Sequence, residues 1–357
     1  MPNHLMLEEL HRSAGARLEE WGGWIAPAQY ADAVAEYRAV RERAGAIDRS
    51  FVGKVAVTGR DRQAFLQGML SNEIKSLAPG QGTSAAFLDA HGKVMAILDV
   101  YVLEDRLLLE LPPGSTDKTL QLLDKFLISE KAEFEAADES FAVIAVEGPQ
   151  SAPALSSLSG RSLDLAPFHH AEVSIAGAPV RVIRRSETGG PGFQCWTAAV
   201  HAPALWSALV GVGATPVGTR ALNVLRVEAG IPWYGIDVDE SVILPETRLE
   251  GLVSYHKGCY IGQEVVARVK YRGHVNRALS GLVLQGSRVP DPGAAVIAEG
   301  RPVGRITSAV SSVALGCPIA LGYVRREFFA PGTAVAVEDA RGALEAHVAE
   351  LPFVTPS

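Results

Sequence analysis

Residues 257–277 of the chain read KGCYIGQEVVARVKYRGHVNR, and the organisation of the remaining sequence is best predicted outward from this stretch. It holds five cationic side chains against one carboxylate, so its local charge is +4 in a chain whose formal net charge is −7. The cations are Lys257, Arg268, Lys270, Arg272 and Arg277. One positive segment in an acidic protein favours a site for a small anion.

A helix is predicted within this stretch over residues 261–270. Its three valines fall on one face, and Glu264 precedes Arg268 by four residues, which is the favourable order for that pair. Gly273 follows the helix, where glycine commonly ends one. The pattern by itself is also that of a capped helix exposed to solvent.

Cys259 stands just before this helix and close to Lys257 in the sequence. A helix N-terminus beside cations is the setting that favours a reactive thiolate at neutral pH. Cys259 and Lys257 are therefore predicted as the catalytic pair, with the thiolate attacking an electrophile or ligating a metal transiently. In the alternative interpretation Cys259 is a half-buried structural residue.

The stretch resembles K-G-C-[FY]-x-G-Q-E-x-x-x-R-x-x-x-R-G-x-x-x-R, the motif of the YgfZ family of folate-binding proteins. These are relatives of the glycine-cleavage T protein, an aminomethyltransferase. The matching positions are Lys257, Gly258, Cys259, Tyr260, Gly262, Gln263, Glu264, Arg268, Arg272, Gly273 and Arg277. T proteins have no fixed cysteine at this place, so Cys259 favours YgfZ within this resemblance.

Composition favours a globular, cytoplasmic protein of two or three domains. The chain has 357 residues, of which 48% are hydrophobic and 20% charged. Its acidity argues against a nucleic-acid partner. The three cysteines are far apart and form no metal-binding pattern, so no metal site is predicted. No signal peptide or membrane span is predicted, and nothing in the sequence calls for more than a monomer.

Outside residues 257–277 the pattern is α+β. Helices are predicted over residues 10–21 and 31–44, in a region similar to the opening of T proteins, which present a histidine, a Gly-Trp, a Pro-x-x-Tyr and a Gly-x-x-Asp in this order. Short strands and turns follow from residue 51, with a helix over 116–127. From residue 278 onward, alternating strands separated by Gly/Pro turns predict a C-terminal antiparallel β-barrel.

The resemblance covers nearly the whole chain and implies a three-lobed, T-protein-like arrangement around a central hole. It implies a discontinuous folate-binding domain 1 made of residues 1–50 and 141–250, with an inserted α+β domain 2 at 51–140. Residues 251–277 would then be a motif segment lining the central site, and 278–357 the barrel.

Two departures from the T-protein pattern bear on activity. T proteins carry T-G-E-x-G-[FY]-E, whose acidic residues help to hold the pterin, whereas this chain has Gly190 and Gln194 at the acidic positions. The aspartate doublet credited with acting on folate N5 aligns with Ala96 and Ile97, and Asp99 is displaced by two or three positions. We therefore expect a cavity that contains no carboxylate able to catalyse a reaction of the bound ligand.

The resemblance implies tetrahydrofolate, or a one-carbon derivative of it, as the bound cofactor. The residues expected to bind it are Arg226, Tyr234, Gln194, Gln263, Arg268 and Arg272. For Arg226 and Glu228 a purely structural pair is the alternative.

The leading functional hypothesis is a tetrahydrofolate-binding protein that supports iron–sulfur cluster assembly or repair, and thereby tRNA modification, with iron–sulfur client or assembly proteins as partners. The alternative is a tetrahydrofolate-dependent aminomethyltransferase or other one-carbon transferase of the T-protein type. A third, weaker hypothesis is the substrate domain of a demethylating oxidase, but no flavin-binding pattern supports it.

Overall fold

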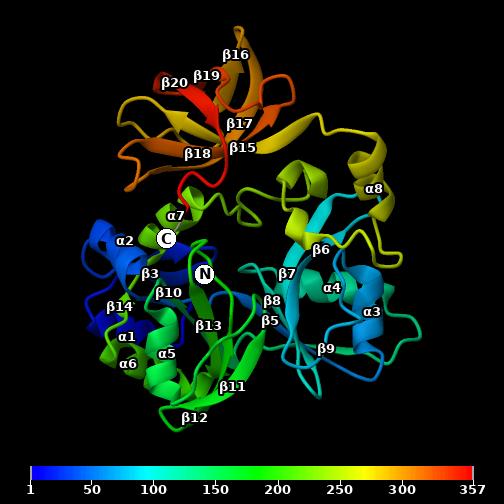
Figure 1. The fold of residues 1–357 in the computed structure, drawn as a ribbon, viewed down its shortest axis with the longest axis vertical. Coiled ribbons are helices and arrows are strands. Elements are labelled where there is room, and N and C mark those ends of the chain that lie inside the picture. The colour runs from blue at the N-terminus through cyan, green and yellow to red at the C-terminus, as the bar shows by residue number, and fades with distance from the viewer. Residues whose placement is uncertain (1, 356–357) are drawn as a thin grey trace.

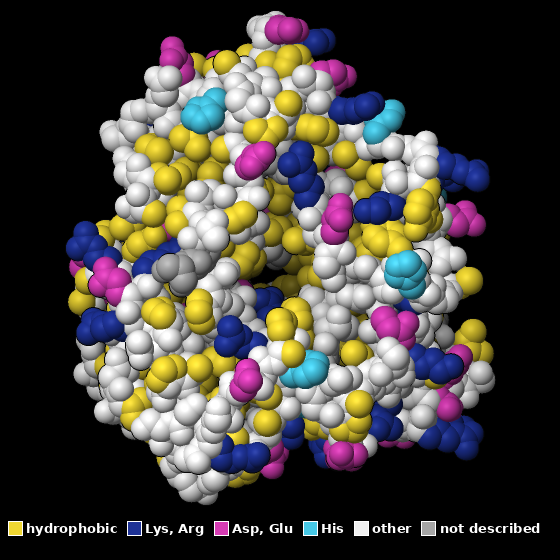
Figure 2. All heavy atoms as spheres, in the orientation of Figure 1, with side chains coloured by type: hydrophobic (Ala, Val, Ile, Leu, Met, Phe, Trp, Pro, Cys, Tyr) yellow, Lys and Arg dark blue, Asp and Glu magenta, His cyan; other side chains and the backbone are white. Residues whose placement is uncertain are grey.

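Three lobes surround a central hollow in the computed structural model, which describes residues 2–355 (Figure 1). A β-barrel forms the top of the molecule in this view, and two lobes built on separate sheets lie below it. The space-filling view of the same face is hollowed where the lobes meet, and hydrophobic side chains border much of the opening (Figure 2). The predicted α+β class, three-lobed arrangement and C-terminal barrel are confirmed.

The first lobe is built on a six-stranded sheet with the order β11-β12-β13-β10-β4-β14. Its strands are β4 (Gly45–Asp48), β10 (Phe141–Glu147), β11 (His170–Ile175), β12 (Ala178–Ile183), β13 (Gly192–Ala198) and β14 (Thr215–Pro216). A small sheet beside it contains β1 (Asn3–His4), β2 (Arg17–Trp21) and β3 (Trp24–Gln29). The helices are α1 (Glu8–Ser13), α2 (Ala33–Glu42), α5 (Ser151–Ser159), α6 (Ala202–Gly211) and α7 (Thr219–Glu228).

Three residues of the T-protein-like opening meet in a buried network of this lobe. His11 Nε2 lies 2.9 Å from Asp48 Oδ2, and Tyr30 Oη lies 2.8 Å from His11 Nδ1. The histidine ring also packs edge-on against Trp206, at a centroid distance of 4.7 Å. The network joins α1, the end of β3 and β4, which gives a structural reason for the spacing of these residue types.

The second lobe is inserted between β4 and β10 of the first. Its antiparallel sheet has the order β6-β7-β8-β5-β9. The strands are β5 (Gly53–Thr58), β6 (Gly82–Leu88), β7 (Val94–Val102), β8 (Leu107–Leu111) and β9 (Glu133–Ala136), and the helices are α3 (Arg62–Met69) and α4 (Thr116–Phe126). Apolar residues of α3, β7 and β8 form one buried core.

The third lobe is a closed barrel with the order β15-β18-β17-β16-β19-β20. The strands are β15 (Arg277–Leu284), β16 (Ala295–Ala298), β17 (Arg301–Ser311), β18 (Pro318–Arg325), β19 (Ala334–Asp339) and β20 (Gly342–Ala349). A Cβ atom at Gly304 would lie 2.2 Å from the carbonyl oxygen of Tyr323, so the contact between β17 and β18 requires glycine there.

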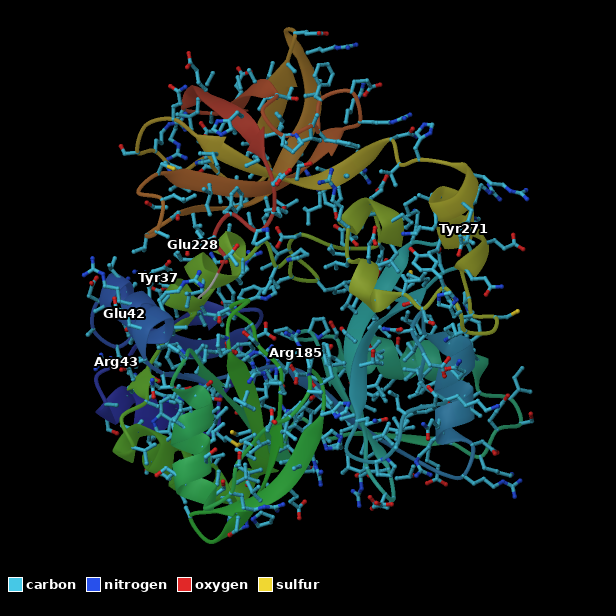
Figure 3. All side chains as sticks on the ribbon, in the orientation of Figure 1. Tyr37, Glu42, Arg43, Arg185, Glu228 and Tyr271 are labelled. Carbon is cyan, nitrogen blue, oxygen red and sulfur yellow. The ribbon has the colours of Figure 1, made fainter. Side chains whose placement is uncertain are left out.

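Helix α7 connects the barrel to the first lobe through the buried carboxylate of Glu228. This carboxylate accepts hydrogen bonds from Tyr37 Oη at 2.5 Å and Arg41 Nη2 at 2.9 Å, both on α2. It also accepts one from Ser312 Oγ at 2.6 Å, in the loop between β17 and β18. Figure 3 shows Tyr37 and Glu228 on adjacent helices below the barrel. One side chain thus holds two lobes together.

The structure corrects two expectations about the chain. The helix predicted over residues 10–21 ends at Ser13, because Gly15 turns the backbone with φ +83° and the next residues pair as β2 with β3. The helix predicted over 261–270 is present as α8 (Gln263–Arg272), but it lies on the outer edge of the molecule beside the second lobe (Figure 1). No helix within residues 2–355 is long and apolar enough to cross a membrane.

Candidate active site

A cavity of about 710 Å³ lies between the first and second lobes. Much of its wall is apolar and aromatic, with Trp21, Phe51, Ile97, Trp233 and Tyr234 among the lining residues. This volume and character are typical of sites for small organic molecules. The aromatic side chains favour a flat ring as the ligand.

Charged residues from both lobes line another part of the cavity. Asp99 on β7 and Glu110 on β8 are directly opposite each other in the second sheet. Arg185 donates through Nε to Asp99 Oδ2 at 2.7 Å, and Arg49 donates to Glu110 Oε1 at 2.9 Å. Figure 3 shows Arg185 between the two lobes, at the side of the hollow.

Glu187 completes this cluster. Its Oε1 atom lies 3.3 Å from Arg49 Nη1 and 3.2 Å from Arg185 Nη1. Burial opposes ionisation of Glu187, yet the charges of Arg185 and Arg49 prevail and lower its pKa. Burial raises the pKa of Glu110 despite the opposing charge of Arg49. Neighbouring carboxyl groups with different proton affinities are typical of acid–base sites.

One oxygen atom of this cluster, Oε2 of Glu110, is buried without a hydrogen-bond or ion-pair partner among the described residues, whereas Oε1 of Glu187 forms ion pairs with Arg49 and Arg185. Both side chains line the cavity. Buried acceptors are normally satisfied, so the free oxygen of Glu110 favours a ligand that carries N–H or O–H donors.

A buried glutamate on β10 positions the loop that carries Arg185 and Glu187. Glu147 accepts hydrogen bonds from Ser186 Oγ at 2.7 Å, Thr188 Oγ1 at 2.8 Å and the backbone N–H of Glu187 at 3.0 Å. Burial raises its pKa to about 7. A Cβ atom at Gly192 would lie 2.4 Å from Glu147 Oε2, so the glycine leaves room for the carboxyl group.

Tyr234 and Gln194 are the predicted folate-binding residues that lie at or next to the cavity. Tyr234 lines it, and its hydroxyl donates to Met95 O at 2.5 Å and accepts from Lys118 Nζ at 2.8 Å. Gln194 is fully buried and donates to Glu110 Oε1 at 3.1 Å. It therefore supports a carboxylate of the wall instead of facing the cavity.

Arg226 lies behind the cavity wall. It pairs with the buried carboxylate of Asp237 and donates to Asn223 Oδ1 at 2.9 Å and Ser308 Oγ at 2.7 Å. Its guanidinium group stacks on Trp233, 4.6 Å from the ring centroid, and Trp233 lines the cavity. With its donors engaged, Arg226 fits the structural alternative and acts on the cavity through Trp233.

The other predicted residues lie outside the cavity. The motif segment 251–277 reaches the cavity wall only through Leu252. Lys257 Nζ donates to the carbonyl oxygens of Gln67, Leu70 and Asn72, which anchors the segment to the end of α3.

Cys259 is exposed to solvent. Gln263, at the start of α8, accepts a hydrogen bond from the backbone N–H of Tyr260 at 3.3 Å. Arg268 and Arg272 are exposed on α8. The structure therefore does not bring these four residues to the central cavity.

The expectation that no carboxylate remains near the cavity is wrong. Ile97 and Asp99 both line it, since residues two apart on β7 share a face, so the displaced aspartate has the same face as Ile97, the second position of the expected doublet. Sequence reasoning missed Glu110, Arg49, Arg185 and Glu187. A glutamate inside the apolar strand LLLEL was the available signal for Glu110. The described residues hold no cluster of His, Cys, Asp and Glu suited to a metal.

Comparison with known proteins agrees with this architecture. The GCVT N-terminal domain matches residues 7–257, and the glycine cleavage T-protein C-terminal barrel domain matches residues 277–355. The chain is 34% identical to an aminomethyltransferase of Streptomyces avermitilis, over 99% of this chain and 97% of that protein. It is 33% identical to an aminomethyltransferase of Streptomyces coelicolor, over 97% and 96% of the two chains.

Among solved structures, the glycine cleavage system aminomethyltransferase T from Bartonella henselae is similar, with a TM-score of 0.92 and 26% identity. The alignment covers 100% of this chain and 99% of that one. Both domains, in the same order and over nearly the full length, are therefore shared. The chain belongs to the glycine cleavage T-protein family.

Proposed function

We propose that the protein binds tetrahydrofolate in the central cavity and acts as a folate-dependent one-carbon transferase, with an aminomethyl group as the unit transferred. Membership of the T-protein family and the relatives named aminomethyltransferase support this over a protein that only binds folate. The observation that carries the proposal is the placement of Asp99, Glu110 and Glu187 in the cavity.

The residues present fit a reduced pterin. Trp21, Trp233 and Tyr234 offer apolar faces for its ring. The unpartnered Oε2 atom of Glu110 can accept a hydrogen bond from an amino or ring N–H group of the pterin edge. When bound, tetrahydrofolate supplies the nitrogen that accepts the one-carbon unit.

Asp99 is the residue best placed to exchange a proton with the bound substrates. It is 5% exposed, lines the cavity and is oriented by Arg185. A general acid or base must reach the reacting proton directly or through one water. The fixed geometry of the Arg185 contact keeps the carboxylate in one orientation, which favours this role.

The test is a titration with tetrahydrofolate and a turnover assay with an aminomethylated lipoyl carrier protein. Asp99→Asn is expected to lower turnover by about 10²–10⁴-fold while the dissociation constant for tetrahydrofolate changes only a few-fold. Asp105→Asn is the matched control, because Asp105 is exposed and, among residues 2–355, its carboxylate pairs with the neighbouring Arg106 alone. Full activity of Asp99→Asn would contradict the assigned role.

The second candidate function is the YgfZ-type one, a tetrahydrofolate binder that supports iron–sulfur cluster assembly or repair. It is favoured by the exposed Cys259 in a segment that matches the YgfZ motif, and by Ala96 and Ile97 at the positions of the T-protein aspartate doublet. It predicts folate binding by the wild-type protein without aminomethyl turnover.

This second candidate has its own test in a strain that lacks the protein. Cys259→Ser is expected to abolish complementation and to leave tetrahydrofolate binding intact. Cys317→Ser, which alters a partly buried cysteine, is the control. An equally active Cys259→Ser variant would exclude a role for this thiol.

A further inference from the structure

A second cavity, of about 340 Å³, lies where the barrel meets the loop after α7. Its size is at the lower end of the range of ligand sites, about 300–1,000 Å³. The charged and hydroxyl-bearing residues of its wall are Arg277, Arg305, Thr307, Tyr323 and Arg325 from the barrel and Asp237, Asp239 and Ser241 from the loop. Three arginines around one small cavity have no role in the function proposed above.

The strand register places the three arginines on one face of the barrel sheet. Arg277 on β15 is opposite Arg325 on β18, and Arg305 on β17 is opposite Tyr323 on β18. Tyr323 and Arg325 are two residues apart, so they share a face. Like charges directly opposite each other destabilise a sheet unless a counter-charge is present.

The carboxylates of the wall compensate only part of this charge. Arg277 donates to Glu246 Oε2 at 3.1 Å and to Ser241 O at 2.9 Å, and Asp237 is paired with Arg226. Within residues 2–355 the side chains of Arg305 and Arg325 are exposed to solvent and make no hydrogen bond or ion pair. Asp239 is the remaining carboxylate of the wall, so the cavity carries an excess of positive charge.

Tyr323 provides an independent sign of a missing partner. Its side chain is 6% exposed, and its buried hydroxyl has no hydrogen-bond partner among the residues described. The guanidinium group of Arg277 stacks on its ring, 5.3 Å from the centroid. A buried hydroxyl that lacks a partner is unfavourable, so this oxygen favours a ligand that can bond to it.

We propose that this cavity binds the phosphate group of a small phosphorylated metabolite. Arginines form charge-assisted, often bidentate hydrogen bonds with phosphate oxygens, and a tyrosine hydroxyl adds a neutral donor. Three arginines and a hydroxyl offer more donors than one carboxylate accepts, which favours phosphate. The volume leaves room for the organic part of a monoester, and free phosphate shares the same chemistry.

The test is a calorimetric titration of the full-length protein with inorganic phosphate and, separately, with glycerol 3-phosphate at constant ionic strength. Arg305→Gln and Arg325→Gln are each expected to weaken binding by about tenfold or more, and Tyr323→Phe by about threefold to tenfold. Arg326→Gln is the control, because it removes the same charge at an exposed neighbour outside the cavity, and it is expected to bind like the wild type. Tighter binding of the monoester supports a metabolite as the source, and equal binding supports free phosphate.

Three results would overturn the proposal. The first is that neither probe binds the wild-type protein at millimolar concentration. The second is that Arg326→Gln loses as much affinity as the cavity variants. The third is abolition of phosphate binding by saturating tetrahydrofolate, which would assign the arginines to that ligand. The titration does not depend on turnover, so its failure is distinguishable from failure of the proposed transferase.

Discussion

Glu147 makes the loop beside the central cavity sensitive to pH. Its pKa is raised to about 7 from an ordinary value of 4.5, with burial as the main cause. The folded protein therefore binds this proton more tightly than the unfolded chain. The stability that results is complete below pH 4.5 and is lost as the pH rises to about 7.

Glu147→Gln keeps the side chain neutral at every pH. The difference in unfolding free energy between variant and wild type is expected to grow in favour of the variant by up to about 3 kcal/mol between pH 4.5 and 8. Urea unfolding at several pH values measures this difference. A difference that does not change with pH would show that folding does not shift the pKa of Glu147.

Lys257 is expected to stabilise the motif segment instead of activating Cys259. Burial lowers its pKa to about 8, and its ammonium group donates hydrogen bonds to three carbonyl oxygens near the end of α3. Lys257→Met should lower the unfolding free energy by about 2–3 kcal/mol, because these buried acceptors lose their donor. The control is Lys270→Met, at an exposed lysine of α8.

The reaction of the Cys259 thiol with a chromogenic disulfide gives a second measurement on the same variants. We expect its rate to change less than about twofold in Lys257→Met, since the ammonium group is engaged elsewhere. A loss of thiol reactivity without a loss of stability would instead support the catalytic pair.

Helix α7 acts as a connector between lobes through alternate polar residues. Glu228 accepts from α2 and from the β17–β18 loop, while Arg226 contacts Asp237 and the barrel residue Ser308. Removing one member of a buried charge pair leaves the other without compensation. Such changes typically lower stability by about 3–5 kcal/mol.

Glu228→Gln is accordingly expected to shift the urea midpoint well below that of the wild type, by about 3 kcal/mol in unfolding free energy. Glu264→Gln, on the exposed face of α8, should change it by less than about 0.5 kcal/mol. Equal midpoints for the two variants would mean that Glu228 does not hold the lobes together.

The barrel and the first two lobes share one hydrophobic core. Val227 and Val238 of the first lobe pack with Leu88 of the second and with Leu279 and Ile319 of the barrel. Residues 1–276 expressed without the barrel are therefore expected not to fold cooperatively, since this core and the partners of Arg226 and Glu228 would be lost. Near-ultraviolet circular dichroism and urea unfolding would measure this, with the full chain as the control. A sharp transition in the truncated protein would contradict it.

Local patterns in the sequence predicted much of the architecture. Periodicity identified α2, α4 and α8, and short alternating strands identified the barrel. The charged residues of the site were harder to predict, because they come from three distant parts of the chain: Arg49 after β4, the strands β7 and β8, and the loop before β13. Sequence gives the register of a strand only to within a residue or two. It therefore did not determine which face of β7 carries Asp99.

For the motif segment 251–277 the sequence predicted the helix but not its position in the molecule. Its composition predicted a helix correctly, but composition does not indicate which lobe a helix packs against. Arg268 and Arg272 were therefore expected at the cavity, although Lys257 fixes the segment on the outer side of the second lobe. The resemblance identified the motif residues but did not indicate where they lie in the folded protein.

Ile236 lines both cavities, so a single aliphatic side chain is part of the partition between them. The side chain is 46% exposed to solvent, and shortening it to alanine would widen both cavities. The two cavities thus have one lining residue in common, and a substitution at this position is expected to change the shape of both.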